Sequence, residues 1–284
     1  MSTVKELLSK GIMLLEENGI EDSIIKAKRL IQYVLKKTAS QIIFDMDDSV
    51  KKCEETQYLE YINQIIKGKP LQYITHEQEF MGFKFYVDEN VLIPQPDTET
   101  LVERAIELIK DVQPDTENID VLDMCTGSGA IAVSIAKLCK NIKICALDIS
   151  DDALEIAKKN AFENEANVEI FKSDMFENIS QNAKFDLIVS NPPYIKETVI
   201  STLSKDVQNE PHIALSGGKD GLDFYRIIAN NAYKYLKYQG KVLVEIGYDQ
   251  AESVEELFEQ THQYDKIRCI KDLSGNDRVI EISF

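Results

Sequence analysis

The sequence predicts an α/β protein in which a doubly wound, mostly parallel sheet follows a small helical bundle. Three patterns indicate this class: apolar residues recur with a helical period over residues 3–68, strand-like and helix-like segments alternate after Asp97, and the chain ends in two more strand-like segments. We therefore expect a helical domain at 1–78, a β-hairpin linker at 79–96 and an α/β domain at 97–284.

The first segment is typical of a helical bundle. Thr3 followed by Glu6 forms a capping-box pattern, and an apolar stripe continues until Asn18 and Gly19 end the helix. Asp22 can cap a second helix, and a third is expected within residues 50–67. Such stripes usually form a core, so we expect these helices to pack together.

A strand pattern begins after Phe80. Apolar side chains at 83, 85 and 87 alternate with Lys84 and Tyr86, and residues 88–90 can form a turn before the apolar run at 91–93. This pattern predicts a short hairpin that joins the two domains.

The α/β domain should contain five strands that alternate with helices, followed by two further strands. Continuous apolar runs such as 187–189 are typical of strands that are buried on both faces. The final strands, at 266–271 and 278–283 with a Gly-Asn turn between them, predict an antiparallel hairpin at the sheet edge. The other strands are expected at 119–124, 142–148, 168–172, 186–190 and 241–246, and the helices at 98–111, with Asp97 as its N-cap, and at 129–139, 151–164, 220–237 and 250–260.

The charge balance argues against a nucleic-acid partner. The chain has 284 residues, with 32 Lys and Arg against 49 Asp and Glu, and a net charge of -17. Residues 1–95 hold 12 basic and 15 acidic side chains, whereas residues 96–284 hold 20 and 34. Because non-specific affinity for nucleic acid comes mainly from basic contacts to phosphates, we expect no direct DNA binding.

The cysteines and histidines predict neither a disulfide framework nor a metal site. The five cysteines form no C-x-x-C pair, and the three histidines lie far apart in the sequence. The N-terminus does not resemble a signal peptide, and no apolar run approaches the about 18 residues of a membrane span. We therefore expect a cytoplasmic protein with free thiols and no membrane partner.

A glycine-rich turn at residues 121–130 predicts a site for a nucleoside cofactor. Glycines let a ligand approach the backbone, and the helix that follows presents free N–H groups. Asp148 lies 19 residues beyond Gly129, at the end of the next strand, where its carboxylate can accept hydrogen bonds from ribose hydroxyls. Asp148 could instead cap a helix, but Ser150 or Asp151 is better placed to do so. The glycines do not distinguish a dinucleotide from S-adenosylmethionine.

The segment Asn191-Pro192-Pro193-Tyr194 predicts a holder for a planar NH₂ group. It follows a buried strand, and its two prolines fix φ and remove two N–H donors. The Asn191 side-chain oxygen and the Pro192 carbonyl can accept both hydrogens of the NH₂ group, while the Tyr194 ring stacks on its π face. This arrangement would direct the nitrogen at an electrophile without a metal. The alternative is a tight strand-to-loop turn.

These motifs together resemble the S-adenosylmethionine-dependent amino-methyltransferases. Further segments are similar to those of the release-factor glutamine methyltransferases of the HemK/PrmC type, and the likeness covers nearly the whole chain from about residue 70. These segments are residues 70–74, 79–82, 91–99, 210–211, 215–222, 245–247 with Gln250, and 271–278.

The resemblance implies a Rossmann-like methyltransferase fold and an enzyme of protein methylation in translation termination. The methyl group of S-adenosyl-L-methionine would pass to the glutamine amide of the Gly-Gly-Gln motif of peptide chain release factors, leaving S-adenosyl-L-homocysteine, with no metal. The helical domain at 1–78 would help to dock the release factor. The implied cofactor contacts are Cys125, Thr126, Gly127, Ser128, Gly129, Asp148, Met175 and Asn191. The implied substrate contacts are Asn191, Pro192, Pro193 and Tyr194, with Asn191, Pro192 and Tyr194 as the catalytic residues.

Two positions depart from the family pattern. Cys125 replaces the usual first glycine, which suggests that the turn does not need a positive φ there, or that a small residue suffices. Gln95 replaces the usual arginine between two prolines, so we do not expect here the salt bridge or cofactor contact that the arginine would make. Glu210 and Asp220 are expected to be structural residues near the active-site loop rather than catalytic bases.

Three other functions fit part of the pattern. A glutamine methyltransferase of a ribosomal protein would share every motif. An adenine-specific DNA methyltransferase presents a similar NH₂ group after base flipping, but it should have a basic DNA-facing surface. A non-catalytic cofactor-binding module that regulates translation would not need the intact Asn-Pro-Pro-Tyr segment.

Overall fold

The computed structural model describes residues 2–112 and 118–284. These form two compact units, Met1–His76 with Leu203–Asn209, and Glu77–Thr202 with Glu210–Phe284. This division differs from the expected boundaries in two respects. The segment after His76 belongs to the larger unit because Phe80 and Phe85 are buried in its core. Leu203–Asn209, far along the sequence, belongs to the helical unit.

The smaller unit is a bundle of short helices. The capping box at Thr3 and Glu6 is confirmed, with a hydrogen bond in each direction. Asp22 precedes the second helix as expected, but it has a φ of 55° and makes no side-chain cap bond. A second capping box, at Thr38 and Gln41, begins a helix that periodicity did not reveal. The helices are α1 (Val4–Glu17), α2 (Ser23–Leu35), α3 (Ala39–Phe44), α4 (Lys52–Ile66), α5 (Leu71–Thr75) and α10 (Lys205–Gln208).

Two polar contacts hold the Leu203–Asn209 segment in the helical unit. Lys26 forms an ion pair with Asp206 at 3.9 Å, and the Asn209 side chain donates to the Gly68 carbonyl at 3.1 Å. This segment follows the Asn-Pro-Pro-Tyr motif in the chain, so the loop after the motif is anchored outside the α/β unit.

The hairpin near residue 80 lies earlier than expected. It pairs β1 (Gln78–Phe80) with β2 (Phe83–Phe85), through a turn at Met81 and Gly82 whose φ values are 51° and 78°. The expected pairing of residues 83–87 with 91–93 across a turn at 88–90 is wrong. Phe80 and Phe85 point into the same core cluster, which favours the tighter turn.

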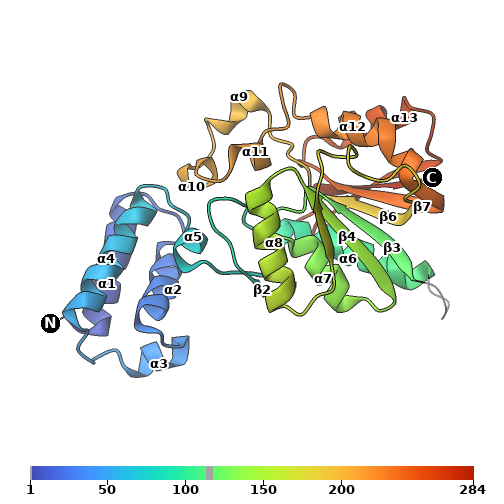
Figure 1. Cartoon of the computed structure of the whole chain (residues 1–284). Coiled ribbons are helices and arrows are strands. Elements are labelled where there is room, and N and C mark those ends of the chain that lie inside the picture. Colours follow the sequence, from blue (N-terminus) through green and yellow to red (C-terminus); the bar gives the residue numbers. More distant parts are fainter. Residues whose placement is uncertain (1, 113–117) are drawn as a thin grey trace. The chain divides into compact units, whose positions relative to one another are not determined.

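The larger unit contains a seven-stranded sheet in the order β5-β4-β3-β6-β7-β9-β8, counted over the described residues (Figure 1). The first five strands in this order are parallel, and β9 is antiparallel to both neighbours. The predicted fold class and the edge hairpin are therefore confirmed. The strands are β3 (Ile119–Met124), β4 (Ile142–Asp148), β5 (Glu169–Lys172), β6 (Phe185–Ser190), β7 (Leu236–Glu245), β8 (Lys266–Lys271) and β9 (Asp277–Ser283).

Helices cover both faces of this sheet. The expected helix at 220–237 is an α-helix followed by a 3-10 turn, and the loop before it contains short helices that the pattern did not predict. The first helix begins after a 3-10 turn, with Gln95 rather than Asp97 at its N-cap position. The helices are η1 (Pro96–Thr98), α6 (Glu99–Val112), α7 (Ala130–Leu138), α8 (Asp151–Glu163), α9 (Glu197–Ile200), α11 (His212–Leu215), α12 (Asp223–Asn231), η2 (Ala232–Tyr235) and α13 (Ala251–Glu259).

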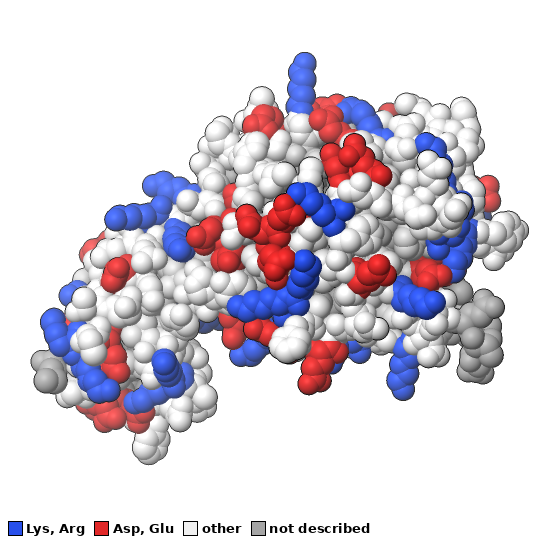
Figure 2. Space-filling view, viewed as in Figure 1, with Lys and Arg blue, Asp and Glu red and all other residues white. Residues whose placement is uncertain are grey.

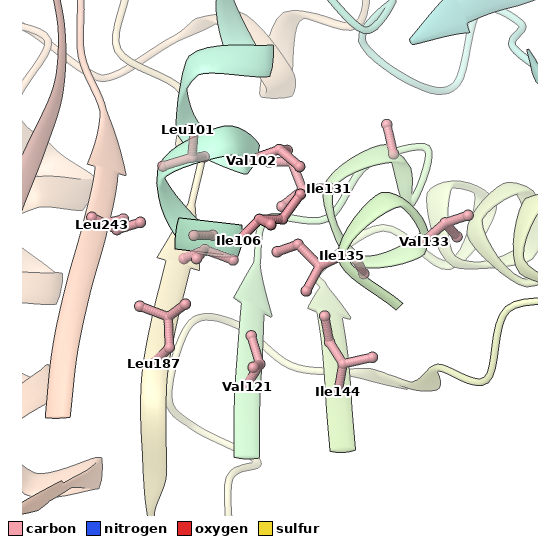
Figure 3. Close-up of a cluster of buried hydrophobic side chains, with 14 of the residues drawn as sticks. Leu101, Val102, Ile106, Val121, Ile131, Val133, Ile135, Ile144, Leu187 and Leu243 are labelled. Carbon is pink, nitrogen blue, oxygen red and sulfur yellow. The ribbon is translucent and has the colours of Figure 1, made fainter. Parts of the chain in front are cut away.

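Alternate residues of each central strand supply the two cores. On one face, Val121, Leu187 and Leu243 pack with α6 and α7, as Figure 3 shows. On the other face, Leu122 and Ile188 pack with α12 and α13. This burial on both faces explains the continuous apolar runs in the sequence.

A buried ion cluster attaches the antiparallel strands to the sheet. The Glu281 side chain on β9 is only 4% exposed, and its carboxylate accepts hydrogen bonds from Arg104 at 2.7 Å, Arg268 at 2.7 Å and Lys241 at 3.0 Å. Burial alone would raise the pKa of Glu281, but the hydrogen bonds from Arg104, Arg268 and Lys241 hold it at about 2.

We expect Glu281→Gln to lower the free energy of unfolding at pH 7 by about 2 kcal/mol, because it removes charge-assisted hydrogen bonds. The pKa of Glu281 is lower in the folded protein than the ordinary value of 4.5, so its ionised carboxylate stabilises the fold at pH values above 4.5. This contribution to stability is lost as the pH falls from 4.5 toward 2. Urea unfolding of both proteins at pH 7 and at successively lower pH measures the difference. Equal stabilities at pH 7 would contradict this account.

Candidate active site

The two sequence motifs meet where the strand order reverses. β3 and β6 are adjacent parallel strands, with Met124 opposite Ser190, and the Ser190 hydroxyl donates to the Met124 carbonyl at 2.8 Å. The glycine-rich turn follows β3, and Asn191 follows β6. In open α/β sheets this reversal point is where ligands bind, so both motifs lie at the favoured place (Figure 1).

A cavity of about 330 Å³ lies at this place in the larger unit. Its wall is mainly apolar, and Val91, Leu92 and Phe224 contribute to it without having been singled out as site residues. Val91 and Leu92 had a sequence signal in the apolar run at 91–93 and in the family segment 91–99, whereas Phe224 lies just beyond the family segment 215–222. Six of the expected site residues border the cavity, namely Cys125, Gly127, Asp148, Met175, Asn191 and Pro193. Five do not, over the described residues: Thr126, Ser128, Gly129, Pro192 and Tyr194.

The glycine-rich turn needs left-handed backbone at three positions. Cys125 has a φ of 59°, so the suggestion that this position does not need a positive φ is wrong, and a small side chain is accommodated there. Gly129 has a φ of 81°, and a Cβ atom there would lie 3.1 Å from the Ala157 Cβ. Gly127, with a φ of 53°, is the third. The turn thus brings its backbone to the cavity while packing closely on α8.

The remaining residues of the turn fix its shape. The Thr126 hydroxyl donates to the Asp123 carboxylate at 2.6 Å, and the Ser128 carbonyl accepts from the Asn160 side chain at 2.8 Å. Asp123 is fully buried on β3. These contacts explain why Thr126 and Ser128 build the turn rather than line the cavity.

Asp148 places a carboxylate at the end of β4. Its Oδ2 accepts from the Gly127 N–H at 2.9 Å and its Oδ1 from the Ser150 N–H at 3.0 Å. The cap of α8 is Ser150, whose hydroxyl accepts from the Ala153 N–H at 3.2 Å, so Asp148 is not needed for that purpose. Burial raises the pKa of Asp148, and the backbone hydrogen bonds partly oppose this rise. Each oxygen retains capacity to accept a further hydrogen bond from a ligand.

Two sulfur atoms lie side by side in the cavity wall. The Cys125 Sγ is 3.8 Å from the Met175 Sδ, and Met175 is buried with a φ of 45°. The Ser173 hydroxyl donates to the Met175 carbonyl at 2.9 Å. Burial raises the pKa of the Cys125 thiol far above its ordinary value, so it remains protonated. This wall is polarisable and apolar, which suits contact with an aromatic ring.

Asn191 presents a free acceptor at the cavity. Its Nδ2 donates to the Thr98 hydroxyl oxygen at 3.3 Å. Neither its Oδ1 nor the Pro192 carbonyl accepts a hydrogen bond from any residue that the structure describes. The Tyr194 hydroxyl instead donates to Glu245 Oε1 at 3.4 Å, and burial raises the pKa of Tyr194. These two oxygens belong to consecutive residues, and an NH₂ group has two hydrogens for such acceptors.

Two family models match the chain. The model described as the methyltransferase small domain matches residues 102–210, and the PrmC N-terminal domain matches residues 6–75. A release factor glutamine methyltransferase of Clostridium acetobutylicum is 42% identical over 98% of this chain and 97% of its own length. The chain belongs to the release factor glutamine methyltransferase family. This confirms the resemblance in the sequence motifs.

Other comparisons agree with this assignment. The release factor glutamine methyltransferase of Streptococcus pneumoniae is 42% identical over 86% of this chain and 85% of its own. A solved methyltransferase structure from Pyrococcus furiosus covers 79% of this chain and 98% of its own, with 22% identity and a TM-score of 0.52. The latter likeness supports the fold alone.

In this member of the release factor glutamine methyltransferase family, a second loop packs on the Asn-Pro-Pro-Tyr backbone. A Cβ atom at Gly217 would lie 2.8 Å from the Pro193 carbonyl oxygen, and one at Gly221 would lie 2.5 Å from that of Tyr194. Gln250 Nε2 donates to the same Tyr194 carbonyl at 3.0 Å. The family segment at 215–222 therefore requires glycines so that two backbones can approach closely.

Three other positions noted in this family member have structural partners. Glu210 is buried and accepts from the Ile93 N–H at 2.9 Å. Asp220 pairs with Arg226, whose guanidinium donates to it at 3.0 Å. Gln95, in place of the family's usual arginine, donates to the Ile93 carbonyl at 3.0 Å.

Two further properties concern only the residues that the structure describes. No described helix is long and apolar enough to cross a membrane. Within the same residues, no group of three or more His, Cys, Asp or Glu side chains is placed to hold a metal ion.

Proposed function

We propose that this protein transfers a methyl group from S-adenosyl-L-methionine to the side-chain amide nitrogen of the glutamine in the Gly-Gly-Gln motif of peptide chain release factors. The observation that carries the proposal is the unpartnered Asn191 Oδ1 of a residue that borders the cavity at the strand-order reversal, followed in the chain by the unpartnered Pro192 carbonyl, both judged over the described residues. The names of the full-length relatives support the same substrate.

The residues around the cavity fit S-adenosylmethionine, which when bound supplies an electrophilic methyl group on a sulfonium. Asp148 would accept hydrogen bonds from the ribose hydroxyls, and Gly127 lets the cofactor approach the backbone. Cys125 and Met175 would pack on the adenine. Residues 96–284 have 34 acidic against 20 basic side chains, a field that favours the positively charged cofactor over its neutral product.

Asn191 and Pro192 would hold the substrate amide by accepting its two hydrogens. Pro193, which borders the cavity, would contact the substrate, and Tyr194 would stack on the amide plane. In this arrangement the nitrogen lone pair is directed at the methyl carbon, so that an N–C bond forms as the S–C bond breaks. The methylated nitrogen then loses its extra proton to water, and S-adenosyl-L-homocysteine remains. No side chain needs to act as a base.

The helical unit would dock the release factor, and the reaction would take place in the cytoplasm, where translation ends. We do not expect DNA as a substrate. Basic and acidic side chains are interspersed over the face shown in Figure 2, and the described residues drawn there form no continuous basic surface. An adenine-specific DNA methyltransferase needs such a surface.

A methyl-transfer assay with three acceptors tests this proposal. The purified protein is incubated with methyl-labelled S-adenosylmethionine and a release factor, a ribosomal protein or adenine-containing duplex DNA. We expect label in the release factor only. Label in the DNA or the ribosomal protein, with none in the release factor, would refute the assignment.

A further inference from the structure

Gln250 is a buried side chain that the proposed reaction does not use. It is 5% exposed and lies between the end of β7 and the start of α13. β6 and β7 are adjacent parallel strands, with Ser190 opposite Val244, so the segments that follow them leave the sheet at the same edge. Gln250 therefore lies beside the Asn-Pro-Pro-Tyr segment, although it does not border the cavity in the part of the chain that the structure describes.

The Gln250 amide is bonded to three stretches of backbone. Its Nε2 donates to the Tyr194 carbonyl at 3.0 Å and to the Gly221 carbonyl at 3.2 Å. Its Oε1 accepts from the Gly247 N–H at 2.9 Å. An NH₂ group has two hydrogens, so both are used. These contacts also determine which way the amide faces, because the reverse orientation would place its oxygen against two carbonyl oxygens.

The backbone packs tightly around this amide. A Cβ atom at Gly221 would lie 2.9 Å from Gln250 Nε2, and one at Gly247 would lie 3.0 Å from Oε1. The contact continues along the chain, since the Ile195 N–H donates to the Leu215 carbonyl at 2.9 Å. The end of the Asn-Pro-Pro-Tyr segment is thus held between the 215–222 loop and the Gln250 side chain, with glycines at the closest points.

The Asn-Pro-Pro-Tyr segment has few bonds of its own to hold it. Its two prolines have no N–H group, so neither can donate to a neighbouring backbone. Before the prolines, the Asn191 side chain donates to the Thr98 hydroxyl at 3.3 Å, and after them the Tyr194 carbonyl accepts from Gln250. The Pro192 carbonyl, which we assign to the substrate amide, lies in the chain between these two attachments.

We propose that Gln250 is a positioning residue for methyl transfer, which holds the Tyr194 and Gly221 carbonyls together and thereby fixes the Pro192 carbonyl and the Tyr194 ring against the substrate amide. This inference rests on the proposed function, because it concerns how the same amide holder keeps its shape. Gln250 acts through the backbone of the segment and does not touch the substrate. A displacement of about 1 Å in such a holder is enough to reduce turnover by about 10²-fold.

Gln250→Met tests the inference because methionine has nearly the same length but cannot donate to either carbonyl. We expect kcat for methyl transfer to a release factor to fall by about 10²-fold. The KM for the release factor and the Kd for S-adenosylmethionine should change by less than about threefold, since neither ligand contacts Gln250. An unchanged Kd also shows that the variant is folded.

Gln263→Met is the matched control. Gln263 is exposed, and its side chain donates only to the Thr261 carbonyl, among the contacts of the described residues. The same change of side chain at this position should therefore leave kcat at the wild-type value.

Gln250→Glu gives a signature that a purely structural role would not produce. The carboxyl has the shape of the amide, and when protonated it can donate to one of the two carbonyls, but when ionised it can only accept. The kcat of Gln250→Glu should therefore exceed that of Gln250→Met at low pH, and should fall to or below it as the carboxyl ionises. Burial should raise the pKa of the introduced carboxyl, so this fall should extend above the ordinary range of a glutamate.

Other titratable and charged side chains surround Gln250, and both variants keep them. The ratio of the two kcat values at each pH therefore isolates the introduced carboxyl. These neighbouring groups are the hydroxyls of Tyr194 and Tyr225, the carboxyls of Asp220, Glu245 and Asp249, and the cationic groups of Lys196 and Arg278.

A second measurement does not depend on the substrate. In the cofactor-bound protein with ¹³C-labelled tyrosine carbonyls and ¹⁵N-labelled asparagine, the Tyr194 carbonyl signal should shift in Gln250→Met, because it loses a hydrogen bond. The side-chain NH₂ signals of Asn191 should shift with it, because its backbone moves. Those of Asn230, exposed on α12, should not.

Three results would each overturn the inference: wild-type kcat in Gln250→Met, a ratio of the two variants that does not change with pH, or Tyr194 and Asn191 signals that stay at their wild-type positions. If the wild type methylates no release factor, the proposed function is wrong, and the NMR measurement still decides whether Gln250 positions the Asn-Pro-Pro-Tyr segment.

Discussion

Asn191→Ala should abolish methyl transfer to a release factor, with kcat reduced by at least about 10³-fold. The substitution removes the side-chain acceptor that we expect to hold one hydrogen of the substrate amide. It leaves the Asp148 carboxylate and the glycine-rich turn in place. Binding of S-adenosyl-L-homocysteine, measured by isothermal titration calorimetry, should therefore change little, while single-turnover methyl transfer is lost.

Asn230→Ala is the matched control for this experiment. Asn230 is exposed on α12, and its side chain donates only to a carbonyl of its own helix, among the contacts of the described residues. It should retain wild-type turnover. Unchanged turnover in Asn191→Ala would refute its role in catalysis. An equal loss of cofactor binding would instead assign Asn191 to the cofactor alone.

Asp148→Asn should weaken the binding of S-adenosylmethionine by about 10- to 100-fold, which corresponds to the loss of charge-assisted hydrogen bonds to the ribose. The introduced amide would keep the shape of the side chain, but only its oxygen could accept hydrogen bonds. That oxygen would already be bound to the N–H of Gly127 or of Ser150. Titration calorimetry measures the Kd, and thermal unfolding shows whether the turn remains folded.

The control for this change is Asp152→Asn, two residues into α8. Asp152 is exposed and does not border the cavity, so its substitution should leave the Kd unchanged. If Asp148→Asn also leaves the Kd unchanged, the cofactor is not held at this carboxylate, and the cavity has another use.

The central strands β3 and β6 could be predicted closely because they are buried on both faces. The apolar run at 187–189 has no other simple explanation, and β6 extends only a few residues around it. The hairpin near Phe80 could not be placed in the same way. The alternation at 83–87 continues beyond β2, and the Met81-Gly82 turn is favoured by packing of distant core residues. The helices α9 and α11 are too short to show a period.

Some residues of the candidate site could likewise be predicted from the sequence, and others could not. Asp148 and Asn191 could be predicted because each follows a recognisable strand, and parallel strands bring their carboxyl ends to one edge. Thr98 could not be connected to Asn191, since only the folded chain brings the 3-10 turn η1 to the end of β6. The positive φ of Cys125 was also hidden, because only glycine signals such a conformation in a sequence.

Tandem mass spectrometry of the Gly-Gly-Gln peptide of a release factor tests the central claim most directly. After incubation with the protein and S-adenosylmethionine, the peptide should gain the mass of one methylene group, and fragment ions should place it on the glutamine side chain. The gain should be absent without cofactor and with Asn191→Ala. A methyl group on another residue, or an unmodified peptide after complete incubation, would contradict the account.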